Sequence, residues 1–270
     1  MHDLSSRERT PRMLAIRNFG LTLILLPGLL FAAESPSAWH KGFTVTPNGW
    51  LAGISGTAGT ISDDLDPGDD LGLPDRVDIE LEGDLEVLGF MFNAQWRGER
   101  WLAMFDSVWA NLSQDATVGR LPILPGTDIR STIDANIYLI AAGYRVDNWQ
   151  RSSLTIFTGM RHYDLEFTID AENGLLPQPV TATVTNKWQD GVIGARWAHA
   201  LNENWSVSVL ADAGWGESNN SSEIAASVAY NFSRWSVIGG VRVLTLDYES
   251  ADYRADLRFY GPLIGVSLRF

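Results

Sequence analysis

The chain has 270 residues, 45% of them hydrophobic, and a formal net charge of −13 at pH 7. This negative charge argues against nucleic-acid binding, because nucleic acids are themselves polyanions. The chain has no cysteine, which excludes a disulfide scaffold, a thiolate metal site, a cysteine nucleophile and an amino terminus lipidated on cysteine.

The amino-terminal segment has the pattern of a secretory signal peptide. Four arginines precede an apolar stretch over residues 19–33 that ends in small residues. This stretch is too short to cross a membrane as a helix, and basic, apolar and small residues in this order are typical of exported proteins. Translation from Met1 and translation from Met13 fit the pattern equally. The pattern does not determine which peptide bond is cleaved. The predicted domains are a signal peptide over 1–33, a short periplasmic lead over 34–42 and one barrel over 43–270.

In the rest of the chain, apolar and polar residues alternate with a period of two. In 85–96, for example, Leu88 and Phe90 share one face, and Gly89 and Asn93 share the other. This alternation is typical of β-strands, and no convincing helical period accompanies it. Ten strands are predicted, at 43–54, 85–96, 101–112, 133–146, 154–165, 188–199, 205–216, 224–232, 235–248 and 255–270.

The predicted connections alternate between short and long. Tight turns are expected at 97–100, 147–151, 201–204 and 233–234, and the remaining connections are mostly longer. This alternation is typical of an antiparallel up-and-down transmembrane β-barrel with short periplasmic turns and longer extracellular loops. Because the number of strands is even, the first strand begins and the last strand ends on the same side of the barrel, the short-turn side.

The last predicted strand has one apolar row that ends on Phe270. The strand is long enough to cross a bilayer at a tilt. A terminal phenylalanine on an alternating strand resembles the carboxy-terminal signature of Gram-negative outer-membrane β-barrel proteins. The resemblance implies that Phe270 is an assembly signal read by the barrel assembly machinery.

Further motifs lie in the second half of the chain, at 188–196, 212–214, 240–242 and 261–265. They resemble those of a largely uncharacterised proteobacterial family of single-domain outer-membrane barrels. The likeness covers most of residues 40–270. It implies a porin-like barrel in the outer membrane and names no substrate.

Tryptophan follows each predicted short turn, at Trp101, Trp149, Trp205 and Trp235. Indole rings favour the boundary between lipid head groups and acyl chains, so we predict an aromatic girdle here. The alternative is that the aromatic rings form the core of a soluble protein. The aromatics expected at the opposite rim are Trp109, Trp188, Trp215, Tyr163 and Tyr248.

A Gly-x-Arg motif recurs in four predicted strands. An arginine on the lipid face would cost about 2–4 kcal/mol at mid-bilayer, so we predict that these arginines face the lumen. Carboxylates on the same face of their strands can pair with these arginines across strands. In a soluble barrel, the same polar face would instead meet solvent and the apolar face would form the core. The predicted lumen-lining residues are Arg145, Arg161, Arg196, Arg242, Asp106, Asp190 and Asp212.

Acidic residues are concentrated between Asp63 and Glu86, where Arg76 is the one basic residue. Oxygen ligands at this density could bind divalent cations or bridge to lipopolysaccharide. The spacing does not match a calcium-binding loop. We therefore favour a solvated acidic loop and predict no metal site.

His162 and Asp164 are the candidates for catalysis, because they share a face near the outer end of a predicted strand. A His–carboxylate pair can orient a general base. The pair is similar to the rim residues of two barrel families: omptin proteases use Asp and His, and lipid A deacylases use His with Ser. However, the fuller omptin pattern is absent, and His162 has the parity opposite to Arg161, toward lipid.

We therefore predict an integral outer-membrane barrel with a narrow or blocked lumen that is not an enzyme. A structural role, a surface interaction or slow passage of small solutes would follow, with membrane lipid and lipopolysaccharide as partners and no cofactor. Two alternatives stay open: an outer-membrane hydrolase that uses His162 and Asp164, and a secreted soluble β-barrel that binds an apolar ligand.

Overall fold

The computed structural model describes residues 39–61, 76–115, 117–118, 127–147, 149–173, 180–250 and 253–270. The predicted signal peptide and most of the predicted lead lie outside the described residues. So do residues 62–75 of the acidic stretch, and no side chain of that stretch is described.

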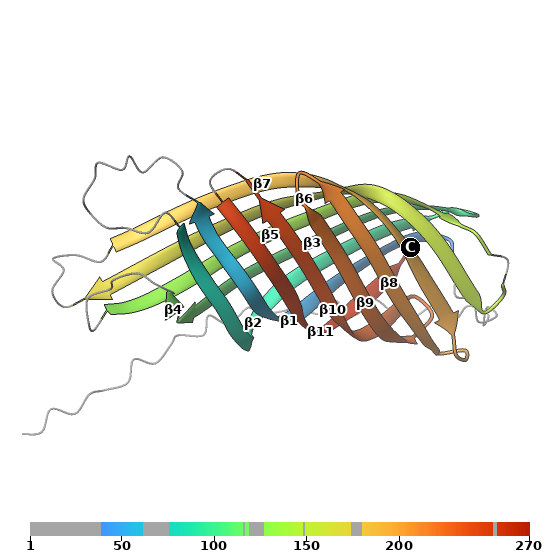
Figure 1. The fold of residues 1–270 in the computed structure, drawn as a ribbon. Helices are drawn as coiled ribbons and strands as arrows, with labels where there is room; N and C mark the ends of the chain where they lie inside the picture. The colour runs from blue at the N-terminus through green and yellow to red at the C-terminus, as the bar shows by residue number, and fades with distance from the viewer. Residues whose placement is uncertain are drawn as a thin grey trace, which may run out of the picture. The chain divides into compact units, whose positions relative to one another are not determined.

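The described part of the chain consists of β-strands joined by turns (Figure 1). The ten predicted strands are confirmed, and many of them extend further toward the longer loops than the alternation indicates. A two-residue strand, β4 (Thr117–Val118), has no counterpart in the alternation and pairs with Ile79 and Glu80. Within the described residues, no helix is long and apolar enough to cross a membrane. The long strands are β1 (Gly42–Ile61), β2 (Arg76–Arg97), β3 (Trp101–Asp115), β5 (Thr127–Arg145), β6 (Ser152–Asn173), β7 (Val180–Ala200), β8 (Trp205–Gly216), β9 (Asn220–Asn231), β10 (Trp235–Glu249) and β11 (Tyr253–Arg269).

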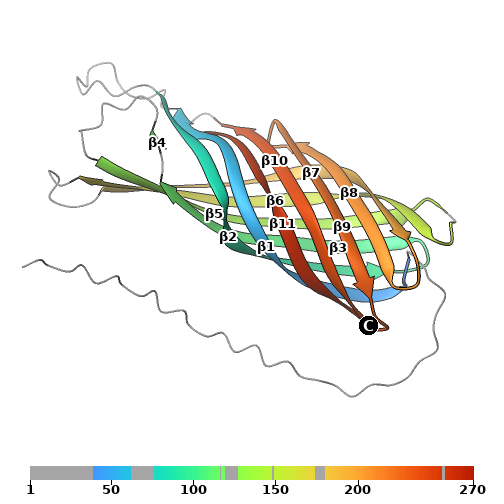
Figure 2. The same cartoon turned by 90° about the horizontal axis from the view of Figure 1, so that it is seen from below.

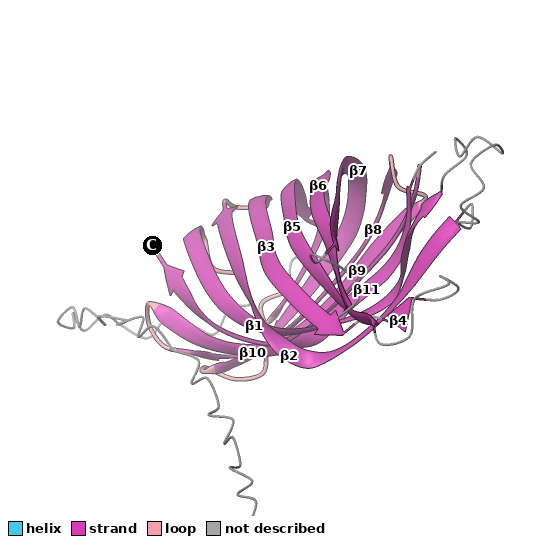
Figure 3. Cartoon of the chain, turned by 90° about the vertical axis from the view of Figure 1, so that its left-hand side faces the viewer, coloured by secondary structure: helices cyan, strands magenta, loops and turns pink. Residues whose placement is uncertain are grey.

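The sheet closes on itself because β1 pairs with both β2 and β11. Thr44 of β1 lies opposite Gln95 of β2 on one side and opposite Arg269 of β11 on the other. The remaining long strands pair antiparallel with their neighbours in chain order. Figures 2 and 3 show the strands curving around a common interior. The predicted ten-stranded antiparallel barrel is confirmed.

The two ends of the barrel differ in their connections. Four short connections, at 98–100, 146–151, 201–204 and 232–234, lie at the end where β1 begins and β11 ends. We call this the short-turn end and the opposite one the long-loop end. At the short-turn end, the amide of Phe270 donates to the carbonyl of Phe43 at 2.8 Å, which closes the seam between β1 and β11.

The outward side chains in the half of the wall nearer the short-turn end are apolar. Leu88 is 74% exposed, Ile140 67%, Met160 58% and Ile264 67%. Every long strand contributes at least one exposed large hydrophobic residue to this belt. A lipid-facing wall requires such a belt, which we call the apolar band.

Toward the long-loop end, the same outward rows become polar. On β6, Ile156 and Met160 are followed by Asp164 and Glu166 on the same outward face. A strand needs about 9–11 residues to cross a bilayer, whereas β6 has 22 and β7 has 21. These strands therefore continue beyond the apolar band, and we call this part of the wall the extension.

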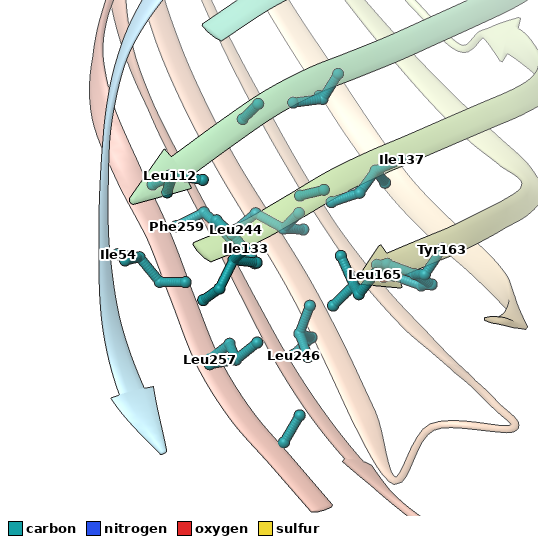
Figure 4. Packing of buried hydrophobic residues seen from close by; sticks show 14 of the residues in the cluster. Ile54, Leu112, Ile133, Ile137, Tyr163, Leu165, Leu244, Leu246, Leu257 and Phe259 are labelled. Carbon is teal, nitrogen blue, oxygen red and sulfur yellow. The ribbon is translucent and has the colours of Figure 1, made fainter. Parts of the chain in front are cut away.

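Inside the extension, the buried side chains are apolar. Residues from β1, β2, β3, β5, β6, β7, β10 and β11 pack into one cluster (Figure 4). Ile133, Leu165, Leu246 and Leu257 are among its members, each 1% exposed or less. We call it the long-loop cluster. The extension is therefore polar outside and apolar inside, as in a soluble barrel, whereas the apolar band is apolar outside.

Candidate functional site in the barrel interior

Two arginines and three carboxylates meet inside the barrel. Arg161 on β6 donates two hydrogen bonds to Asp212 on β8, at 3.0 and 2.7 Å, and one to Glu223 on β9 at 3.0 Å. Arg242 on β10 donates to the same Glu223 oxygen and to Asp106 on β3, both at 2.8 Å. We call these five residues the ionic layer. Because charge-assisted hydrogen bonds are short and strong, this layer links five strands across the interior.

Four of the five members of the ionic layer are buried, and the side chain of Asp106 is 16% exposed. Arg161 is 0% exposed, Glu223 4%, Arg242 5% and Asp212 7%. Burying a charge is costly unless it is paired, and here each guanidinium contacts two carboxylates. Gly194 on β7 permits this packing, because a Cβ added there would lie 2.6 Å from the Cβ of Asp212.

A chain of amides leads from the ionic layer toward the short-turn end. Asn93 donates to Asp106 at 3.3 Å and accepts from Gln95 at 2.6 Å. The amide oxygen of Gln95 in turn accepts from Arg97 at 2.6 Å and from Arg196 at 2.7 Å. Arg196, one of the predicted lumen-lining residues, therefore joins this network through a neutral amide.

Two other predicted lumen-lining residues make their hydrogen bonds outside the ionic layer, although Asp190 lies opposite Arg161 in the pairing of β6 with β7. Arg145 donates to Asp147 at 3.1 Å and to the carbonyl of Trp149 at 2.9 Å, in the connection between β5 and β6. Asp190 accepts from the amide and the hydroxyl of Ser218 at 3.0 and 2.6 Å, beside the connection between β8 and β9. Both residues therefore fix turns.

Asp147 is the central acceptor of the first of these turns. Burial raises its pKa, but hydrogen bonds from the Leu154 amide, the Arg145 side chain and the Trp149 amide outweigh that effect and hold the pKa below its ordinary value. The carboxylate is therefore ionised at neutral pH and holds the short turn together.

Glu223 is the member of the ionic layer that the alternation does not indicate. The pattern begins the strand at Ile224, whereas β9 begins at Asn220, so Glu223 falls just outside the predicted strand. The sequence did contain a signal for it. Glu223 lies two positions before Ala225 and four before Ser227, so in a strand it shares the inward face with these small residues.

Buried apolar side chains lie on both sides of the ionic layer, and on the short-turn side those within strands come from β3, β5, β6 and β7. Along β3, Leu102 and Met104 precede Asp106, and Val108 and Ala110 follow it. Val108 and Ala110 belong to the long-loop cluster. Along β3 the inward side chains therefore run from apolar through ionic to apolar. Leu102 and Met104 belong to a second apolar group, which we call the short-turn cluster. Its other members are Trp39, Leu139, Ala141, Phe157 and Val192.

Three aromatics predicted for the outer girdle at the long-loop end point inward instead. Trp188 is 1% exposed and stacks on Tyr163 and Tyr248, with ring centroids 4.8 and 4.2 Å apart. The prediction is wrong for these three, because the row that faces inward becomes apolar in the extension. Trp215, 60% exposed, does lie on the outside.

The tryptophans after the short turns lie on the outer surface. Trp101 is 61% exposed, Trp149 56%, Trp205 43% and Trp235 40%. Phe270 is 76% exposed, and its ring centroid lies 6.5 Å from that of Phe43. A membrane girdle and an assembly signal stay predictions for these residues.

His162 and Asp164 lie on the outside of β6, where the apolar band meets the extension. Asp164 pairs with Lys187 at 2.9 Å, and the His162 ring stacks on Tyr138 with centroids 6.4 Å apart. Nδ1 of His162 has no hydrogen-bond partner among the described residues. Within the described residues, no hydrogen bond or ion pair joins the histidine ring to a carboxylate.

Metal ligands are not gathered in the part of the chain that the structure describes. It contains no group of three or more His, Cys, Asp or Glu side chains that could hold a metal ion. The side chains of the acidic stretch lie outside that part, so the solvated acidic loop stays a prediction and divalent-cation binding there stays its alternative.

The fold is that of known outer-membrane barrels. The outer membrane protease OmpT from Escherichia coli matches with a TM-score of 0.60 at 9% identity, over 88% of this chain and 100% of that chain. Neisserial surface protein A matches with a TM-score of 0.33 at 12% identity, over 85% and 98% of the two chains. No protein-family model and no curated protein sequence matches. At this identity the likeness to OmpT establishes the fold alone.

Proposed function

We propose that the chain is an integral protein of the Gram-negative outer membrane whose barrel is closed to solutes and whose functional surface is the extension. The observation that carries this proposal is the set of buried side chains inside the barrel. The short-turn cluster, the ionic layer and the long-loop cluster succeed one another along the barrel axis. The role is therefore structural or a surface interaction, with outer-membrane lipid and lipopolysaccharide as the surroundings of the wall.

The apolar band supports a membrane location over a secreted soluble barrel. Large apolar side chains are exposed on every long strand, with Leu88 at 74% and Ile264 at 67%. A soluble monomer rarely exposes apolar patches larger than a few hundred Å². An apolar ligand would also have little room inside, because the long-loop cluster occupies the interior of the extension.

The hydrolase hypothesis has less support. Catalysis by His162 would need an orienting group, and the candidate Asp164 is paired with Lys187. OmpT is a protease by its name, but a shared fold does not transfer an activity.

We expect the purified, refolded chain to give no stepwise current in a planar lipid bilayer at high salt, because a closed barrel leaves ions no aqueous path. Insertion is verified on the same preparation by heat-modifiable mobility in gels. A general porin inserted under identical conditions serves as the conducting control. Discrete steps of reproducible size, seen only with the folded form, would contradict the closed interior.

A further inference from the structure

A pocket at the short-turn end carries basic side chains without acidic partners. Arg97, Arg196, Ser153 and Thr155 line it together with the ring of Trp39. We call it the arginine pocket. No carboxylate is among its lining residues.

The two arginines share a single neutral acceptor. Both donate to the amide oxygen of Gln95, Arg97 at 2.6 Å and Arg196 at 2.7 Å. Neither forms an ion pair within the described residues. A guanidinium has five N–H donors, so most of the donor capacity of this pair stays unused.

Asp106 and Asp147 already have cationic partners. Asp106 accepts from Arg242 at 2.8 Å, and Asp147 accepts from Arg145 at 3.1 Å. The arginine pocket therefore keeps two positive charges in a chain whose net charge is −13. Two like charges held in one partly buried pocket repel each other, and a bound anion would relieve that repulsion.

The remaining lining residues complete a set of donors. Ser153 is 3% and Thr155 2% exposed, and neither hydroxyl makes a hydrogen bond within the described part of the chain. The Trp39 ring lies 5.6 Å from Cζ of Arg97, and Trp39 Nε1 donates to the carbonyl of Gly98 at 3.0 Å. A cation–π contact of this kind fixes the guanidinium, so the pocket is largely preformed.

We propose that the arginine pocket binds a phosphate-type oxyanion, either as a free ion or as the head group of an anionic lipid. Two guanidinium forks and two hydroxyls offer donors in several directions, as an anion with several equivalent oxygens requires.

The test is calorimetric titration of the refolded full chain, in micelles of an uncharged detergent, with inorganic phosphate. The wild type should bind phosphate, and sodium chloride at matched ionic strength should not reproduce the heat. Arg97→Gln and Arg196→Gln should each weaken binding at least about tenfold, the effect of losing one charge-assisted contact. Arg196→Lys, which keeps the charge, should weaken it less than Arg196→Gln.

Arg258→Gln is the matched control, because Arg258 is exposed on the outward face of β11 near the long-loop end. It should bind phosphate as the wild type does, and heat-modifiable mobility reports whether each variant is folded. Micelles doped with phosphatidic acid distinguish the source of the anion: loss of phosphate binding identifies the lipid head group, and unchanged binding identifies the free ion. Absence of phosphate binding by the folded wild type, or undiminished binding by a folded Arg97→Gln, Arg196→Gln double variant, would overturn the proposal.

Discussion

Replacing Arg161 with Gln is expected to lower the free energy of unfolding by about 3–5 kcal/mol, the usual effect of breaking a buried ion pair. The guanidinium is 0% exposed and makes three hydrogen bonds to Asp212 and Glu223. Glutamine supplies neither the charge nor the bidentate geometry, so Asp212 is left buried without a cationic partner. Urea-induced unfolding in phospholipid vesicles measures the loss.

Arg258→Gln serves as the control for this substitution as well. Arg258 is exposed on the outward face, and surface substitutions of this kind usually stay within about 0.5 kcal/mol. A second variant, Arg161→Gln with Asp212→Asn, should recover part of the loss because it removes the stranded charge. Equal stabilities of Arg161→Gln and Arg258→Gln would show that the ionic layer does not brace the barrel.

Trp188→Ala is expected to lower the free energy of unfolding by about 3–5 kcal/mol, the range for deleting a buried large aromatic side chain. Trp188 is 1% exposed and stacks on Tyr163 and Tyr248. Its removal leaves a cavity in the long-loop cluster that the stiff closed wall cannot collapse to fill. The same vesicle unfolding assay measures the change.

Trp215→Ala provides a comparison of the same residue type on the opposite face. Trp215 is 60% exposed on the outside of β8, so its loss creates no internal cavity and should destabilise the barrel less. If Trp215→Ala proves the more destabilising of the two, then the interior of the extension is not the packed core described above.

The strands could be predicted from the sequence because alternation reports which residues share a face. It does not report which face points into the barrel. Along β6 the apolar residues lie first on the outward face and then on the inward face. Ile156 and Met160 are the apolar outward residues in the apolar band, whereas Tyr163 and Leu165 are the apolar inward residues in the extension. The phase of the alternation therefore shifts by one residue where the wall leaves the band.

That phase shift was visible in the sequence, and neglecting it placed Trp188, Tyr163 and Tyr248 on the outer rim. The partners within the ionic layer could not be predicted in the same way. Arg161 meets Asp212 and Glu223 across 51 and 62 positions of sequence. Such pairing depends on the register and tilt of strands that do not neighbour one another, which parity does not determine.

The central claim is that the wall changes character along its length, with lipid outside the apolar band and water outside the extension. Labelling of single cysteines by a water-soluble maleimide present on both sides of a vesicle membrane tests it most directly, because the chain has no native cysteine. Three positions on β7 suffice: Ile193, 50% exposed in the apolar band; Lys187, with a side chain 59% exposed in the extension; and Val192, 2% exposed inside.

Lys187→Cys should react rapidly, while Ile193→Cys and Val192→Cys should react only after the barrel is unfolded in detergent and heat. Lipid shields position 193, and the packed interior shields position 192. Rapid labelling of folded Ile193→Cys, at a rate matching Lys187→Cys, would contradict the membrane band and with it the proposed location of the protein.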